Sequence, residues 1–323
     1  MTTLRIGTRG SPLALHQAHA VAGLLRERAG VASEIVVIRT SGDRLADAPL
    51  SEAGGKRLFV KEIEEALLGG DIHLAVHSSK DMPALLPEGL AIGAVLPRED
   101  ARDAVVLPSG VPHPGEGLAS VARALGQAAR VGTSSVRRSA QLARLWPGAR
   151  CSPVRGNLDT RLRKLDAGEH DALVLAAAGL IRLARAHRIS AALPIEACVP
   201  APGQGIIAVE VRGGDEGTRR LVARINDEAA GAALEAERAV VARLGGGCQM
   251  PLGAHAQVSG PTLVLTAVVL SLDGGREARA AARGDARDAA RLGLEVGDRL
   301  LEGGAGALLA EAGQATSTDR PAP

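Results

Sequence analysis

The chain has 323 residues, of which 46% are hydrophobic and 23% are charged, and its formal net charge is only +2. This balance is typical of a globular protein of two or three domains and excludes a disordered chain. No apolar run reaches the roughly 18 residues of a membrane span, and the aromatic content of 1% argues against nucleic-acid binding by base stacking.

Strand-like and helix-like segments alternate over the first two thirds of the chain. The expected strands are Leu4–Thr8, Glu34–Thr40, Ile72–Ser78, Leu90–Leu96, Ala104–Leu107, Arg130–Gly132, Arg150–Val154 and Ala172–Ala176. The expected helices between them are Pro12–Arg28, Val60–Leu68, Ser135–Leu145 and Leu158–Ala167. This alternation predicts α/β layers with largely parallel sheets.

Two connectors interrupt this pattern, PREDARD at 97–103 and PIEACVPAPGQG at 194–205. They suggest a chain that leaves one domain, builds a second and returns. We therefore predict a first domain of residues 1–99 and 200–217 and a second of residues 100–199. A third, α+β domain is expected over 218–323, with strands Ala254–Ser259, Leu263–Leu270 and Glu277–Ala282, helix Ala286–Leu301 and a disordered tail, TSTDRPAP. In PGQG we expect backbone flexibility to matter more than side-chain chemistry.

Arginine dominates the basic residues, since only four of the 38 are lysines. Between Arg123 and Arg188, twelve arginines and one lysine face four acidic residues. A coding bias accounts for much of the preference for arginine but not for this clustering. Because the guanidinium group pairs well with carboxylate and phosphate, the cluster predicts a polyanionic ligand.

Two segments place arginines beside expected helix N-termini. In VGTSSVRRSAQL (131–142), Thr133 and Ser134 can cap the helix whose first turns carry Arg137 and Arg138. Cations are disfavoured at this end of a helix, so the arrangement favours a bound anion, although two solvated surface arginines remain the alternative.

The second of these segments is VRGNLDTRLRKL (154–165), where Arg155 precedes the good N-cap Asn157. Arg161 and Lys164 share one helical face. The same geometry in one domain favours a second anion site.

Three further segments carry residues suited to chemistry. In AVHSSKDMP (75–83), Lys80 and Asp81 follow a buried strand, where α/β sheets place ligands, although Asp81 could be only a helix cap. In RLGGGCQMPLGAHA (243–256), Cys248 follows three glycines, although a lone cysteine is often an inert small side chain. LSEAGGKRLFVKE (50–62), with Lys56 and Phe59, reads as a lid or a plain loop.

The histidines and cysteines predict no metal site. His16 and His19 lie three apart without a third ligand in register, so we interpret them as surface or core residues. Three cysteines without a CxxC pair argue against disulfides and structural zinc, and the N-terminus, MTTLRIGTRG, lacks a secretory signal. We expect a cytoplasmic protein.

Eight segments in order resemble the porphobilinogen deaminase (hydroxymethylbilane synthase) family: GTRGSPLAL, GGKRLFVKE, HSSKDMP, GTSSVRRSAQL, RGNLDTRLRKL, LAAAGLIRL, APGQGIIAVE and GGGCQMPLGAHA. The resemblance implies two α/β domains like type II periplasmic binding proteins, plus a smaller C-terminal α+β domain. It also implies one dipyrromethane cofactor per chain, joined to Cys248 by a thioether. Four porphobilinogen molecules are then added to this primer with loss of ammonia, and hydroxymethylbilane is released for porphyrin and haem biosynthesis.

The resemblance also assigns roles to individual residues. Asp81 matches the catalytic aspartate, which would stabilise the cationic azafulvene left by loss of ammonia. Lys56 and Phe59 fall in the lid, and Gln17 and Arg182 line the same cleft. The residues expected to contact cofactor or substrate carboxylates are Arg9, Ser11, Ser78, Lys80, Thr133, Ser134, Ser135, Arg137, Arg138, Arg155 and Arg161.

The sequence departs from the usual family pattern at Gly245, Ala101 and Arg57, which puts hinge stiffness and lid motion in doubt but not the reaction. We expect porphobilinogen as substrate, a monomer, and no nucleic-acid or membrane partner. Three rival functions remain: a solute-binding protein for an organic acid, an arginine-rich nucleic-acid binder, and a hydrolase using Cys248 with His255.

Overall fold

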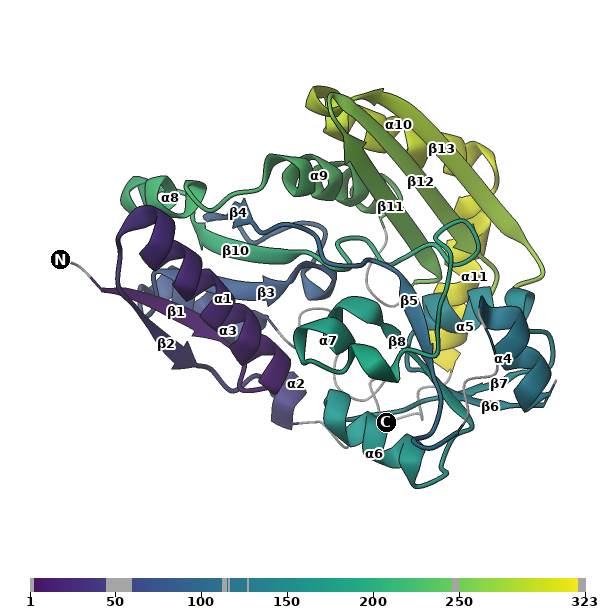
Figure 1. Cartoon of the computed structure of the whole chain (residues 1–323). Coiled ribbons are helices and arrows are strands. Elements are labelled where there is room, and N and C mark those ends of the chain that lie inside the picture. The colour runs from purple at the N-terminus through teal and green to yellow at the C-terminus, as the bar shows by residue number, and fades with distance from the viewer. Residues whose placement is uncertain are drawn as a thin grey trace.

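The computed structural model describes residues 3–44, 60–111, 115, 117–126, 128–245 and 250–318. Within these residues the strands form three separate sheets, two of five strands and one of three (Figure 1). Figure 1 shows the first sheet on the left, the second at lower right and the third at upper right. The expected division into two α/β layers and a smaller α+β unit is confirmed.

The first sheet has the strand order β2–β1–β3–β10–β4. β1 pairs in parallel with β2 and β3, whereas β10 runs antiparallel to β3 and β4. The bounds are Leu4–Thr8 for β1, Ser33–Val37 for β2, Leu74–Ser78 for β3, Leu90–Val95 for β4 and Ile207–Arg212 for β10. Four strands therefore share one direction, as expected, and one is reversed.

Helices cover both faces of the first sheet, because successive strand residues point to opposite sides. Helix α1 (Pro12–Ala29) buries Val21 and Leu25 on one face. Helix α3 (Lys61–Gly69) buries Ile63 and Leu67 on the other, and the short α2 spans Ser41–Arg44.

The second sheet repeats this pattern, with the order β7–β6–β8–β5–β9. β6 is parallel to β7 and β8, and β5 is antiparallel to β8 and β9. The strands are β5 (Asp103–Val106), β6 (Arg130–Gly132), β7 (Arg150–Ser152), β8 (Ala172–Ala176) and β9 (Ala191–Ala192). The helices are α4 (Gly117–Leu125), α5 (Val136–Leu145), α6 (Leu158–Asp166) and α7 (Ala177–Arg182), with a 3₁₀ turn η2 at Ala186–Arg188.

Both reversed strands follow a crossover between the sheets. β5 begins where the chain leaves β4 of the first sheet, and β10 begins where it returns from β9 of the second. The two connectors recognised in the sequence are these crossovers. Each sheet is thus completed by a strand that has just arrived from the other.

The third sheet, β11–β12–β13, is antiparallel throughout and packs against helices α9 and α10. Its elements are β11 (Leu252–Ser259), β12 (Thr262–Leu270), β13 (Glu277–Asp285), α9 (Glu228–Arg243), η3 (Ala286–Asp288), α10 (Ala289–Glu302) and α11 (Ala305–Thr318). Apolar residues of α11, including Leu308 and Leu309, join the same core.

Two expectations for this part of the chain differ from the structure. Helix α8 (Glu216–Ala223) packs on the first sheet through Val222, although helices after residue 218 were expected in the third domain. The tail was expected to be disordered from Thr316, but α11 continues to Thr318 because its apolar face has the third core to pack against. No helix in the described part of the chain is both long enough and apolar enough to cross a bilayer.

Candidate functional site

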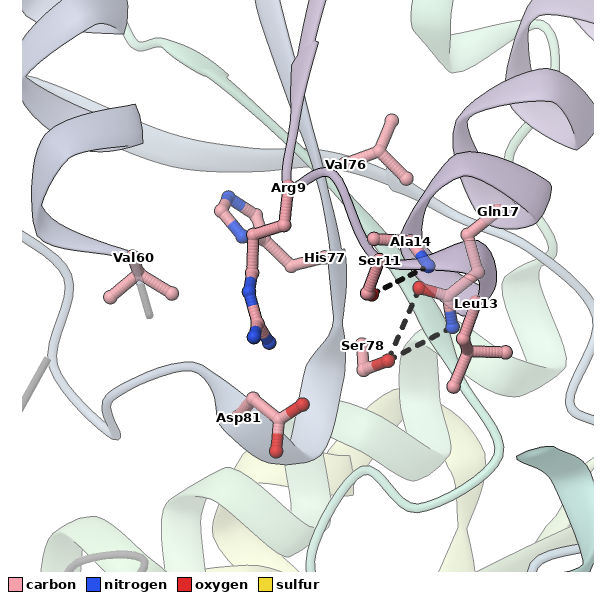
Figure 2. A pocket seen from close by; sticks show the side chains of 10 residues that line it. All are labelled: Arg9, Ser11, Leu13, Ala14, Gln17, Val60, Val76, His77, Ser78 and Asp81. Carbon is pink, nitrogen blue, oxygen red and sulfur yellow. Dashed lines mark hydrogen bonds between the residues drawn. The ribbon is translucent and has the colours of Figure 1, made fainter. Parts of the chain in front are cut away.

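A small pocket of about 70 Å³ lies where β1 and β3 end (Figure 2). Ten residues line it: Arg9, Ser11, Leu13, Ala14, Gln17, Val60, Val76, His77, Ser78 and Asp81. Five of these, Arg9, Ser11, Gln17, Ser78 and Asp81, were predicted from the sequence. The structure therefore brings together site residues that lie up to 72 positions apart in the chain.

The pocket is held together by the start of α1. The Ser11 hydroxyl caps this helix by accepting a hydrogen bond from the Ala14 amide at 3.3 Å. One turn later the Gln17 side chain, only 2% exposed, donates to the Ser78 hydroxyl at 2.9 Å. These contacts fix the end of β3 against the first turns of α1.

Asp81 lies on a short turn immediately after β3. This turn is the 3₁₀ helix η1 (Ser79–Asp81), and the backbone is extended again at Met82. Since no helix begins after Asp81, the alternative that it serves only as a helix cap is wrong. Its side chain is exposed, and Figure 2 shows the Arg9 side chain reaching down toward it.

Two cations of the second sheet, Arg155 and Arg161, flank the start of α6. Asn157 caps this helix, as predicted, by accepting from the Thr160 amide at 2.9 Å. The Nε of Arg161 donates to the Gly156 carbonyl at 2.8 Å, which orients its guanidinium group. Arg155 is half-buried in the loop before this helix.

The charges of the two sheets act on each other. Burial lowers the pKa of Lys80 to about 8, and repulsion by Arg138 adds to the shift, while Asp81 opposes it. Burial likewise lowers the pKa of Arg161, with Arg138 and Arg155 adding repulsion and Asp81 attraction. Lys80, just after β3, and the arginines of the second sheet therefore interact electrostatically with one another and with Asp81. A ligand with several carboxylates would relieve this crowding of like charge.

Arg137 and Arg138 differ from the expectation that they hold an external anion at the start of α5. They are 3% and 7% exposed, and both bind the buried carboxylate of Asp103, Arg137 at 2.7 Å and Arg138 at 2.8 Å. The alternative of two solvated surface arginines is wrong, because both side chains are buried. The anion that compensates these cations is an aspartate of β5, so a role for the pair in ligand contact stays a prediction.

The Asp103 carboxylate is strongly stabilised in its charged form. Burial alone would raise its pKa, but Arg137 and Arg138, with a hydrogen bond from Gln204, hold the pKa far below the usual range. Arg137 also donates to the Val199 carbonyl at 2.7 Å. Together these contacts connect α5, β5 and the second crossover.

The remaining predicted residues of the second sheet have mainly local contacts. Ser135 caps α5, and the Ser134 hydroxyl donates to the Val154 carbonyl at 2.7 Å. Thr133 is buried and accepts from the Ser135 amide at 3.3 Å. Arg182 donates to the Gly205 carbonyl at 2.7 Å, and burial lowers its pKa. Cys248, Lys56 and Phe59 lie outside the described residues.

Sequence reasoning missed three buried polar residues near the site. Asp103 ends a connector read only as a hinge, and Gln204 lies in PGQG, where side-chain chemistry was discounted. Glu210, fully buried in β10, lies 2.9 Å from the ring of His77, which lines the pocket. The one available signal was a polar residue inside an apolar strand pattern, as at Glu210 in IIAVEVR.

Two linked α/β layers with an exposed carboxylate among clustered cations are typical of α/β proteins that bind anionic ligands. Residues 4–220 match the family model "Porphobilinogen deaminase, dipyromethane cofactor binding domain", and residues 232–302 match "Porphobilinogen deaminase, C-terminal domain". The chain belongs to the porphobilinogen deaminase family. These enzymes are hydroxymethylbilane synthases of tetrapyrrole biosynthesis and carry a dipyrromethane cofactor.

Curated relatives agree along almost the whole chain. The chain is 47% identical over 309 residues to "Porphobilinogen deaminase" of Geobacter metallireducens, covering 95% of this chain and 94% of that one. It is 48% identical over 309 residues to "Porphobilinogen deaminase" of Roseiflexus sp., covering 95% and 99%. The match includes the C-terminal domain, which separates the chain from a simple solute-binding protein.

Solved structures resemble the chain only distantly. The VFT2 domain of Bordetella pertussis BvgS covers 69% of this chain and 85% of its own, with 17% identity and a TM-score of 0.42. The L-cystine solute receptor of Neisseria gonorrhoeae covers 76% and 94%, with 12% identity and a TM-score of 0.41. Similarities this low do not assign the fold of the chain, so the fold class is assigned from the arrangement of its own three sheets.

Proposed function

We propose that this chain condenses four porphobilinogen molecules into hydroxymethylbilane with Asp81 as its catalytic carboxylate. The observation that carries this assignment is the position of Asp81. Its exposed side chain lines the pocket and is coupled electrostatically to Lys80 and Arg161. A carboxylate at this position would face the substrate, and the surrounding cations would attract the carboxylates of that substrate.

The proposed chemistry needs one carboxylate and several cations. Each porphobilinogen carries an acetate and a propionate, and loss of ammonia leaves a cationic azafulvene. Asp81 would accept hydrogen bonds from pyrrole N–H groups and stabilise this cation as it develops. Arg9, Ser11 and Ser78 around the pocket would hold substrate carboxylates, while Gln17 holds Ser78 in place.

The residues present fit a dipyrromethane group, which is itself a tetracarboxylate. Burial and repulsion by neighbouring arginines, Arg138 above all, lower the pKa values of Lys80 and Arg161, so an anion would be favoured beside them. Lys80, Arg155 and Arg161 are proposed to bind its carboxylates, and Cys248 to bear it as a thioether. When bound, the group supplies the pyrrole carbon to which the first substrate is joined.

Several broader assignments belong to the same proposal. The free thiols of Cys151 and Cys198 fit a reducing compartment such as the cytoplasm. We propose a monomer of three domains: the first of residues 1–99 and 200–217, the second of residues 100–199, and the third of residues 218–323. The two crossovers support the boundaries between the first and second domains. The packing of α8 on the first sheet favours a start of the third domain near Asp227.

The substitution Asp81→Asn tests the catalytic assignment. It keeps the size of the side chain but removes the negative charge and the ability of the carboxylate to take up and release a proton. The variant should fold and retain its primer yet turn over about 10²- to 10³-fold more slowly, the usual cost of losing one preorganised electrostatic group. Asp81→Glu should keep part of the activity. A near-normal single-turnover rate for Asp81→Asn would remove Asp81 from the mechanism.

Intact-protein mass spectrometry tests the attachment site independently. Active protein should exceed its sequence mass by one dipyrromethane unit. Cys248→Ala should abolish the extra mass, whereas Cys151→Ala and Cys198→Ala should keep it, because only a thiol at the attachment point forms the thioether. Sequence mass in active protein would refute a covalent primer.

A further inference from the structure

Gln204 lies at the centre of the second crossover and is completely buried. Its side-chain amide donates to the Ala101 carbonyl at 2.7 Å and to the Asp103 carboxylate at 2.9 Å. Its side-chain oxygen accepts from Arg138 at 3.3 Å. Since one end of an amide only donates and the other only accepts, these partners fix its orientation.

On one side, Gln204 completes the network around Asp103. Without Gln204, Arg138 would lose one acceptor and Asp103 one donor, in a region where buried polar groups need partners. The Nε of Arg138 and the Gln204 amide both donate to the same carboxylate oxygen, Oδ1 of Asp103. Gln204 is therefore one of three partners that position the Arg138 guanidinium group, beside Asp103 and the Val174 carbonyl at 3.2 Å.

On the other side, the backbone at Gln204 joins a second buried ion pair. Arg98 donates from Nε to the Gln204 carbonyl at 2.9 Å and binds Glu237 of α9 at 2.7 and 3.0 Å. The Gly203 amide donates to the same glutamate at 2.6 Å. The crossover is thereby tied to the unit whose loop carries Cys248.

The same segment supports the turn that carries Asp81. The Ser79 amide donates to the Ile206 carbonyl at 3.0 Å. Gly203 has φ +73°, and a Cβ there would lie 2.5 Å from the Ser79 hydroxyl oxygen. Gly205, at φ +87°, approaches Glu99 so closely that a Cβ would lie 2.3 Å from its carbonyl oxygen. Both glycines are required for close packing, so this crossover is a fixed joint and not a flexible loop.

We propose that Gln204 is a positioning residue for the reaction, which holds Arg138 of the second sheet in register with the Asp81 turn of the first. The proposal rests on the proposed function of Asp81. Gln204 touches neither the pocket nor Asp81 and acts through Arg138, Asp103 and the backbone it anchors. Misplacing a catalytic group by about 1 Å costs up to about 10²-fold in rate. A shift of Arg138 relative to the Asp81 turn should therefore be measurable as a loss of kcat.

A matched control exists in Gln141 of α5, which is 2% exposed. It also makes two buried hydrogen bonds to the second crossover, donating to the Val199 carbonyl at 3.0 Å and accepting from the Val199 amide at 2.7 Å. Its side chain has no hydrogen bond to Asp103, Arg138 or Ser79 among the described residues, although it lies one turn after Arg138 on α5. Gln204→Met removes three side-chain hydrogen bonds and Gln141→Met removes two, but those of Gln141 involve neither Asp103 nor Arg138.

The experiment compares these two variants as primer-loaded enzymes. Both should melt at lower temperature by similar amounts. Gln204→Met should lower kcat for porphobilinogen about 10- to 100-fold with KM changed less than about threefold, and should speed hydrogen exchange at the amides of residues 79–82. Gln141→Met should keep kcat within about threefold and leave exchange at this turn unchanged.

Equal kcat losses in the two variants, or unchanged exchange at residues 79–82 in Gln204→Met, would overturn the proposal. If Gln204→Met does not fold, the milder variant Gln204→Asn keeps the amide group on a side chain one methylene shorter, which withdraws it from Arg138 and Asp103, and the same loss of kcat relative to Gln141→Met is expected. Failure of both to fold would show a structural role instead. A normal rate for Asp81→Asn would refute the proposed function. A slow Asp81→Asn together with equal losses of kcat in Gln204→Met and Gln141→Met would refute only the role of Gln204.

Discussion

Two pairs of arginines in the second sheet differ in what neutralises them. Arg137 and Arg138 on α5 are buried and share one carboxylate, Asp103. Arg155 and Arg161 near α6 are half-buried, and neither has a carboxylate ion pair among the described residues. All four come from sequence segments that predict the same anion-binding geometry.

The difference shows that a local excess of positive charge has two uses. Around α5 it compensates a buried acid and joins the crossovers into one network. Around α6 the two arginines have no carboxylate partner among the described residues, and Arg161 is repelled by Arg138 and Arg155, so we propose that they bind an anionic ligand. Substitutions should therefore affect stability in the first pair and ligand binding in the second.

The largest effect is expected from Asp103→Asn, which leaves two buried guanidinium groups without their carboxylate. Removing one partner of a buried ion pair typically costs about 3–5 kcal/mol of the free energy of unfolding. Urea unfolding measures this change. The control, Asp159→Asn, breaks a half-exposed pair with Arg185 at 3.6 Å and should stay within about 0.5 kcal/mol. Equal losses in the two variants would contradict a special role for the buried network.

The same acid predicts a pH dependence of stability. The pKa of Asp103 is lowered in the folded protein, so its contribution is complete above the ordinary aspartate pKa of about 3.9 and is lost as the pH falls below it. The free energy of unfolding should therefore drop more steeply below about pH 4 in the native protein than in Asp103→Asn.

A smaller effect, on binding alone, is expected from Arg161→Leu and Arg155→Leu. Each should weaken the binding step of primer assembly or porphobilinogen binding about 10- to 100-fold, since a charge-assisted contact is worth about 1.5–3 kcal/mol. The melting temperature should hardly change. Arg291→Leu on α10 is the control, because Arg291 is exposed and pairs with Asp288 at 2.9 Å, far from the cluster in the chain. Arg137→Leu should instead lower the melting temperature. The comparison would be contradicted if Arg137→Leu weakened binding alone while Arg161→Leu and Arg155→Leu lowered the melting temperature.

The pKa of Lys80 gives a further test of the cluster of cations around Asp81. Its pKa is lowered to about 8 by burial and by Arg138, so it loses its proton where an ordinary lysine stays charged. The unfolded chain then binds the extra proton between pH 8 and about 10.5, and the contribution of Lys80 to stability rises over this interval.

The measurement is NMR of ¹³C-lysine in Cys248→Ala protein, which lacks the proposed attachment site of the primer. Only four lysines contribute signals, and Lys80→Arg assigns the one of interest. A midpoint near 8 is expected for Lys80, and a midpoint near 10.5 would show that the cation cluster is more hydrated than its burial implies.

The smallest effect concerns Cys198, which lies 3.5 Å from the Asp103 carboxylate. Burial, reinforced by that carboxylate, raises its pKa to about 12. At pH 8 a thiol reagent should hardly label Cys198 in the folded protein, because the reactive thiolate is almost absent. Labelling should appear only on unfolding, and earlier in Asp103→Asn. Fast labelling of the native protein would show that the network opens readily.

Local patterns were sufficient for most of the regular elements. The capped helix at Pro12, the buried strand that ends at Ser78 and the Asn157 cap all follow from short-range sequence preferences. Short elements without a clear pattern, such as α7 and β9, were missed, and so was α11, whose last three residues were assigned to a disordered tail. Those segments are ordered mainly by packing against neighbours, which no local window contains.

The sequence by itself determined the alternating α/β architecture, the two crossovers and the turn that presents Asp81, because hydrophobic periodicity and turn residues are local properties. It also determined the family, since the motifs persist in order along the chain. Only the tertiary structure decided which arginines pair with Asp103 and that Gln204 is a buried junction. Charge compensation and hydrogen-bond satisfaction in the interior depend on residues 30 to 100 positions away, and their pairing arises only when the two sheets and the crossovers pack together.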